Sequence, residues 1–148
     1  MDLLEKLSSQ IKEAMKWGDS FKVGTLRMVV SAVKNREIEK RAKSSDPLTE
    51  EEIMEVLRRE VKKRRESIEI YGSAGRGDLK EKEELELKVI QSYLPSELTE
   101  AEIEKIVAQA MSGGERELGK IMKAVKEMIG GRADGKLVSE IIKKHLEA

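Results

Sequence analysis

Apolar residues recur at helical spacing in one segment after another of this chain, and no segment alternates apolar and polar residues for long enough to predict a strand. The first segment carries Leu4, Leu7, Ile11 and Met15 on one side. Only two prolines interrupt the 148 residues, and strong use of glutamate, lysine and leucine favours helices. We therefore expect an all-α protein.

Signals for helix ends divide the expected helices into two groups. Two capping boxes, Thr49–Glu52 and Thr99–Glu102, predict helix starts. The second follows Pro95, which ends the preceding helix. We place a domain boundary there, so that residues 1–95 form a four-helix unit and residues 96–148 form a small three-helix domain. The helices of the small domain are expected at residues 100–111, 115–129 and 135–146.

The composition excludes several classes of protein. There is no cysteine, which excludes disulfides and thiolate metal sites, and His145 is the only histidine. We therefore expect no metal and no cofactor. The longest apolar stretches are too short to span a bilayer, and the first residues do not resemble a signal peptide. We expect a cytoplasmic protein that does not bind a membrane.

Residues 130–137, GGRADGKL, come close to the phosphate-binding P-loop pattern, in which a serine or threonine follows the lysine. Leu137 stands in that place and cannot ligate magnesium, and a helical pattern rather than a strand precedes Gly130. We interpret the segment as a connection between helices. Gly130 or Gly131 supplies the left-handed conformation that ends one helix, and Asp134 caps the next.

Basic residues outnumber acidic ones by eight to four between Arg116 and Lys144. We expect the glycine turn to expose backbone amides beside a helix start, which favours anions. Such a surface suits an RNA phosphate backbone, whereas the aromatic content of 3% argues against stacking of single-stranded bases. The alternative is a solvated helix face without a ligand. The candidate RNA-binding residues are Lys120, Lys123, Lys126, Arg132, Lys136, Lys143 and Lys144.

A second and weaker basic patch lies in the segment VLRREVKKRR, and it comprises Arg58, Arg59, Lys62 and Lys63. The alternative here is a solvated helix face that the acidic fourth helix neutralises. In the same segment Glu60 and Arg64 fall inside the apolar arc, four residues apart, which predicts an ion pair.

No catalytic site is expected. Arg36 falls inside the apolar arc of the second helix, as Glu60 and Arg64 do in the third. A catalytic carboxylate is the alternative to structural ion pairing for these charges. No nucleophile and base of the serine–histidine or serine–lysine kind can be assembled from the sequence.

Several motifs resemble one known family in order and spacing. LRMVVSAVKNREIEKR, RRESIEIYGSAGRGDL and IQSYLPSELTEAEI are similar to the N-terminal portion of the stand-alone YqeY-like (GatB/YqeY) proteins. LGKIMKAVKEMIGGRADGKLVSEIIKKHL resembles the tail that these proteins share with the B subunit of tRNA-dependent amidotransferases. The resemblance implies a four-helix unit and a three-helix tail. In the amidotransferase, the tail helps hold tRNA while misacylated Glu-tRNA or Asp-tRNA is amidated.

The resemblance implies a translation-related accessory protein that binds tRNA or another structured RNA. The activity attached to the family is carbon–nitrogen ligation with glutamine as the nitrogen donor. The kinase-like core of the amidotransferase is far longer than 148 residues, so we expect no catalysis by this chain alone. The alternatives are a helical adaptor for an aminoacyl-tRNA synthetase or an amidotransferase, and an enzyme in its own right.

Overall fold

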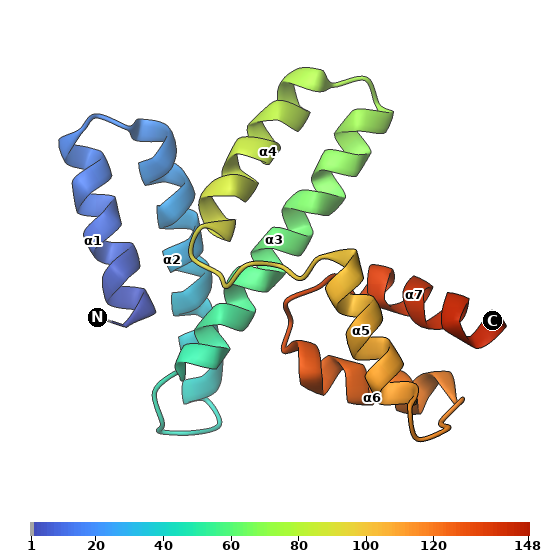
Figure 1. Ribbon diagram of the computed structural model, residues 1–148. Coiled ribbons are helices and arrows are strands. Elements are labelled where there is room, and N and C mark those ends of the chain that lie inside the picture. The colour runs from blue at the N-terminus through green and yellow to red at the C-terminus, as the bar shows by residue number, and fades with distance from the viewer. Residues whose placement is uncertain (1) are drawn as a thin grey trace. The chain divides into compact units, whose positions relative to one another are not determined.

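The computed structural model describes residues 2–148, which contain seven helices and no strand (Figure 1). The all-α prediction is therefore confirmed. The chain divides into two compact units, Met1–Leu94 and Pro95–Ala148, called here the N-terminal unit and the C-terminal unit. That each unit is an independently folding domain stays a prediction. Within residues 2–148, every helix is too short or too polar to cross a bilayer.

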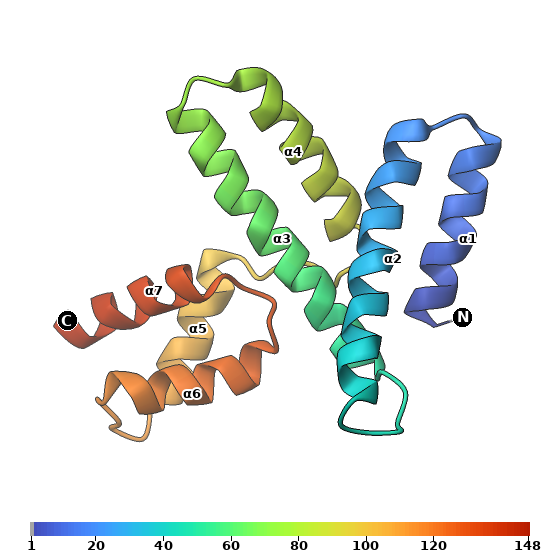
Figure 2. The ribbon, with the colours of Figure 1, turned by 180° about the vertical axis from the view of Figure 1, so that it is seen from behind.

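The N-terminal unit is built from two helical hairpins (Figures 1 and 2). Its helices are α1 (Leu3–Lys16), α2 (Ser20–Arg41), α3 (Glu50–Ser73) and α4 (Gly77–Gln91). Helix α2 packs against each of the other three. The buried core residues are Leu3, Leu7, Leu26, Val29, Val33, Ile53, Val56, Leu57, Val61 and Ile90. Those of α3 all lie in its first half, so the outer part of the α3–α4 hairpin extends beyond this core.

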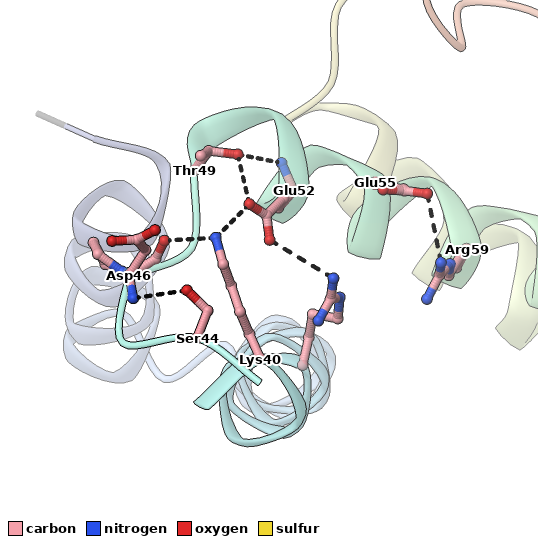
Figure 3. Close-up of polar contacts among 9 residues, drawn as sticks. Lys40, Ser44, Asp46, Thr49, Glu52, Glu55 and Arg59 are labelled. Carbon is pink, nitrogen blue, oxygen red and sulfur yellow. Dashed lines mark hydrogen bonds and ion pairs between the residues drawn. The ribbon is translucent and has the colours of Figure 1, made fainter. Parts of the chain in front are cut away.

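The connection between α2 and α3 is held by contacts around Glu52 (Figure 3). Lys40 Nζ donates to the Pro47 carbonyl at 2.9 Å and to the Glu52 carboxylate at 2.6 Å. The hydrogen bond from Lys40 is the main reason why the pKa of Glu52 is lowered. Thr49 Oγ1 accepts from the Glu52 amide at 3.1 Å, which is one half of the predicted capping box. Arg36 reaches the same carboxylate at 3.7 Å, so its place in the apolar arc serves an ion pair.

The C-terminal unit contains α5 (Glu100–Met111), α6 (Leu118–Ile129) and α7 (Gly135–Glu147). The predicted capping box starts α5: Thr99 Oγ1 accepts from the Glu102 amide at 3.2 Å, and Glu102 accepts from the Thr99 amide at 3.3 Å. Helix α6 begins three residues later than predicted, after a turn in which Gly114 has a φ of 89°. The three helices bury Ile103, Val107, Ile121, Val125, Ile129, Val138, Ile141 and Ile142 together.

Candidate nucleic-acid interface

The seven predicted RNA-binding residues of the C-terminal unit are all exposed. On α6, Ile121 and Val125 face the core. This places Lys123 on the outer face, with Lys120 and Lys126 to either side of it. The remaining four residues lie in the turn after α6 and on α7.

Helices α6 and α7 run in opposite directions (Figure 1), and a hydrogen bond joins their free ends. Arg116, just before α6, donates from Nη2 to the Leu146 carbonyl near the end of α7 at 2.8 Å. Lys136 at the start of α7 therefore lies at the same end of the helix pair as Lys126, while Lys143 lies toward the opposite end. The candidate cations are thus spread along both helices rather than gathered at one point.

Most of these cations have no protein partner. Lys120 lies 3.5 Å from Glu117. Within the part of the chain that the structure describes, no side-chain hydrogen bond or ion pair holds the other lysines of the set, which are Lys123, Lys126, Lys136, Lys143 and Lys144. Their ammonium groups are therefore free to meet an anion from outside.

The glycine turn between α6 and α7 has the predicted left-handed backbone conformation, but two of its amides are not exposed as predicted. Gly130 and Gly131 have φ values of 59° and 81°, and Gly130 ends α6 in the left-handed conformation. The Gly130 amide donates to the Lys126 carbonyl at 3.0 Å and the Arg132 amide to Ile129 at 3.3 Å. The prediction that the turn exposes amides to an anion is wrong for these two, because this type of helix end uses them on its own last carbonyls.

The start of α7 already has an acceptor. Asp134 Oδ1 accepts from the Lys136 amide at 3.4 Å, which is the predicted cap. The Asp134 carboxylate also places a negative charge where a phosphate would otherwise benefit from the helix dipole. Contacts to a phosphate in this region therefore depend on side chains.

Arg132 has a structural role that the sequence did not reveal. Its Nε donates to the Ser96 carbonyl at 3.0 Å, and its own carbonyl accepts from the Leu98 amide at 2.8 Å. Arg132 thus ties the segment before α5 to the turn before α7. No local pattern signals a contact between residues 36 positions apart.

The second basic patch is largely neutralised within its own helix. Arg58 pairs with Glu51 at 2.8 Å, Arg59 with Glu55 at 3.5 Å (Figure 3) and Lys63 with Glu60 at 3.7 Å. Of the four candidates, only Lys62 has no ion-pair partner among residues 2–148. The solvated-face alternative fits these contacts, although the partner acids belong to α3 and not to α4 as expected.

The predicted Glu60–Arg64 pair is confirmed, and a third member joins it. Arg64 Nη1 donates to Glu60 Oε2 at 2.6 Å, and Arg64 Nε lies 3.5 Å from Glu86 Oε2 of α4. All three side chains are buried or nearly so. Burial raises the pKa of Glu86, the charge of Glu83 raises it further, and Arg64 opposes both effects.

Metal ligands are not brought together. Within residues 2–148 no three histidine, aspartate or glutamate side chains are arranged to hold a metal ion. His145 lies in the last turn of α7, where a cation suits the helix dipole.

Comparison with known proteins identifies relatives of the whole chain. The model of the family described as Yqey-like protein matches residues 4–146, which confirms the resemblance found in the sequence. "Altered inheritance of mitochondria protein 41, mitochondrial" from Pyrenophora tritici-repentis is 31% identical over 150 aligned positions, which cover 96% of this chain and 80% of the relative. The protein of the same name from Eremothecium gossypii is 38% identical over 109 positions, 74% of this chain. That match spans only 57% of the relative's own length.

These names overturn the prediction of a cytoplasmic protein, because the relatives are mitochondrial proteins. The prediction rested on apolar stretches too short to span a bilayer and on the lack of a signal-peptide pattern. Those features separate secreted and membrane proteins from the rest, but they do not distinguish one reducing compartment from another.

Proposed function

Because the chain belongs to the family of YqeY-like proteins, we propose that it is an accessory protein that docks tRNA or another structured RNA on α6 and α7. The observation that carries the proposal is the set of exposed lysines on these two helices that have no side-chain partner among residues 2–148. Phosphate contacts of this kind position an RNA without reading its sequence. A partner enzyme, either a tRNA-dependent amidotransferase or an aminoacyl-tRNA synthetase, supplies the catalysis in this role.

Three lysines form the centre of the proposed interface. Lys123 and Lys126 are about one helical turn apart on α6, and Lys136 follows the turn at the same end of the helix pair. Arg132 is left out of this centre because its Nε already holds Ser96. Lys120 is left out because Glu117 lies beside it.

The experiment is a titration of labelled tRNA at several salt concentrations with the parent chain and the variant Lys123→Ala/Lys126→Ala/Lys136→Ala. Each lysine–phosphate contact removed should lower the magnitude of the slope of log affinity against log salt by ~0.7 to 0.9, so the triple variant should lower it by ~2.1 to 2.7. Alanine favours helix, so the far-UV circular dichroism should not change.

The matched control removes the same number of charges from α3, as Arg58→Ala/Arg59→Ala/Lys62→Ala. It should have a smaller effect, since both arginines are paired with glutamates of the same helix. If the α6–α7 variant binds tRNA like the parent with an unchanged slope, the proposal is wrong. Binding to a partner protein that salt does not weaken would favour the adaptor alternative.

A further inference from the structure

An open groove of about 460 Å³ lies between α2 and α3 in the N-terminal unit. Helix α2 contributes Arg27, Met28, Ser31 and Asn35 to its lining, and α3 contributes Lys63 and Arg64. Arg27, Ser31 and Asn35 follow one another at intervals of four residues, so they form one stripe along α2. None of the predicted or proposed RNA contacts on α6 and α7 belongs to this groove.

The groove is rich in hydrogen-bond donors that are not used within the protein. The Ser31 hydroxyl and the Asn35 amide have no hydrogen-bond partner among residues 2–148. Among the described residues, Arg27 Nη2 donates only to the Met15 sulfur at 3.7 Å, and Arg64 Nη2 donates only to the Met28 sulfur at 3.9 Å. A thioether is a weak acceptor, so an oxygen ligand would serve both guanidinium groups better.

The net charge of the groove suits a ligand with one negative charge. Arg27, Lys63 and Arg64 line it, and Glu60 is the only acid among its lining residues. That carboxylate is already engaged by Arg64 at 2.6 Å and by Lys63 at 3.7 Å. Glu86 lies behind Arg64 at 3.5 Å and leaves an excess of one positive charge.

The surroundings favour a single oxyanion over a row of phosphates. The stripe of α2 continues from Asn35 to Glu39, which is exposed. A nucleic-acid backbone that followed α2 would therefore meet a carboxylate one turn beyond the donors. The groove is also too open for a free small molecule, because sites for such ligands bury ~70–90% of the ligand surface, whereas Arg27, Met28, Ser31, Asn35 and Lys63 are all exposed.

We propose that the groove between α2 and α3 receives one carboxylate side chain from an acidic segment of a partner protein. The donors of Ser31, Asn35 and Arg64 face the carboxylate, and Arg27 and Lys63 attract it from the rim. Met28, which is flexible and 44% exposed, packs against an apolar residue beside the acid. This inference is independent of RNA docking by the C-terminal unit.

The test uses the full chain and two capped peptides, Ac-Leu-Glu-Leu-NH2 and Ac-Leu-Gln-Leu-NH2. Asn35 is the only asparagine of the chain, so its side-chain amide is readily assigned in a 1H–15N NMR spectrum. The glutamate peptide should shift the Asn35 amide and the Arg64 Nε–H saturably, and the glutamine peptide should not. Arg27→Ala and Lys63→Ala should each weaken binding about two- to fivefold, the range for an exposed charge pair.

Two variants on the same helices serve as controls: Lys34→Ala and Lys62→Ala remove exposed lysines outside the lining. Both should bind the glutamate peptide as the parent does. Equal shifts with both peptides, or no shift of Asn35, would overturn the inference. A shift of Asn35 by tRNA but not by the glutamate peptide would also overturn it and assign the groove to RNA.

Discussion

Replacing Arg64 by methionine should remove the cation that two buried carboxylates share. Glu86 loses its ion pair, and Glu60 keeps only the exposed Lys63 among residues 2–148. The side chain of Arg64 is 8% exposed, that of Glu60 13% and that of Glu86 10%. Removing one partner of such a buried ion pair typically destabilises a protein by ~3–5 kcal/mol, because the remaining charges stay desolvated. Because the free energy of unfolding of a small domain is ~5–15 kcal/mol, this loss should be a large part of the stability of the N-terminal unit.

The assay is urea unfolding followed by near-UV circular dichroism. The only tryptophan and both tyrosines, Trp17, Tyr71 and Tyr93, lie in the N-terminal unit, so this signal does not report on the C-terminal unit. With a typical slope of ~2 kcal/mol per molar urea, the unfolding midpoint should fall by about 1.5–2.5 M. Arg59→Met is a matched control on the same helix, since the Arg59–Glu55 pair is exposed and worth at most ~1 kcal/mol.

A second variant tests the physical cause. Replacing Glu60 and Glu86 by leucine together with Arg64→Met removes all three charges and keeps a side chain of similar size at each position. Stability should return to about the parent level or exceed it, because no charge then stays buried. If Arg64→Met unfolds at the same urea concentration as Arg59→Met, the carboxylates are effectively solvated and the argument from burial is wrong.

Three further predictions concern pH, the glycine turn and the connection before α5. Because the pKa of Glu86 is raised, the folded state binds its proton more tightly than the unfolded state does. The free energy of unfolding should therefore increase as the pH falls from above that pKa towards 4.5. Urea midpoints of the Glu86→Gln variant should not show this increase. Gly130→Ala should destabilise the C-terminal unit by about 1 kcal/mol in far-UV thermal melts, because a φ of 59° is unfavourable with a Cβ although no atom blocks it; an unchanged melt would contradict this. Limited proteolysis should cut residues 95–98 or the Gly72–Gly77 turn before any helix interior. Cleavage at residues 95–98 should be faster in Arg132→Ala, which loses the hydrogen bond to Ser96. First cuts inside α4 would contradict the predicted helix boundaries.

The helices could be predicted because their signals are local. Apolar spacing predicted helices throughout the chain, the Thr99–Glu102 box marked the start of α5, and the Gly130–Gly131 pair marked the end of α6. Periodicity does not say where a helix leaves the core, however. Met15 continues the apolar stripe of α1 but is 54% exposed, while Ala14 is buried.

The candidate sites depend on contacts between distant segments, and these were missed. Spacing within one helix predicted the Glu60–Arg64 pair, but nothing near Arg64 in the sequence indicates Glu86 on α4. The groove between α2 and α3 likewise joins residues about 30 positions apart, none of which forms a recognisable motif with the others. In the sequence, Arg132 is one of several cations of a basic tail, whereas in the structure its hydrogen bond to the Ser96 carbonyl gives it a structural role.

The two proposed surfaces differ in how their charges are arranged, so the salt dependence of binding distinguishes them. The lysines of α6 and α7 are spread along two helices, and all but Lys120 have no side-chain partner among residues 2–148. Their effect on binding therefore grows with the number of phosphates contacted and falls steeply as salt rises. The groove of the N-terminal unit has a net excess of about one charge and places neutral donors beside a buried guanidinium. Binding there depends on geometry and on one ion pair, so it should weaken only slightly with salt. A partner whose affinity for the chain depends little on salt and falls about two- to fivefold in Lys63→Ala therefore binds the groove. A partner whose affinity depends steeply on salt and falls in the α6–α7 variant binds the C-terminal unit.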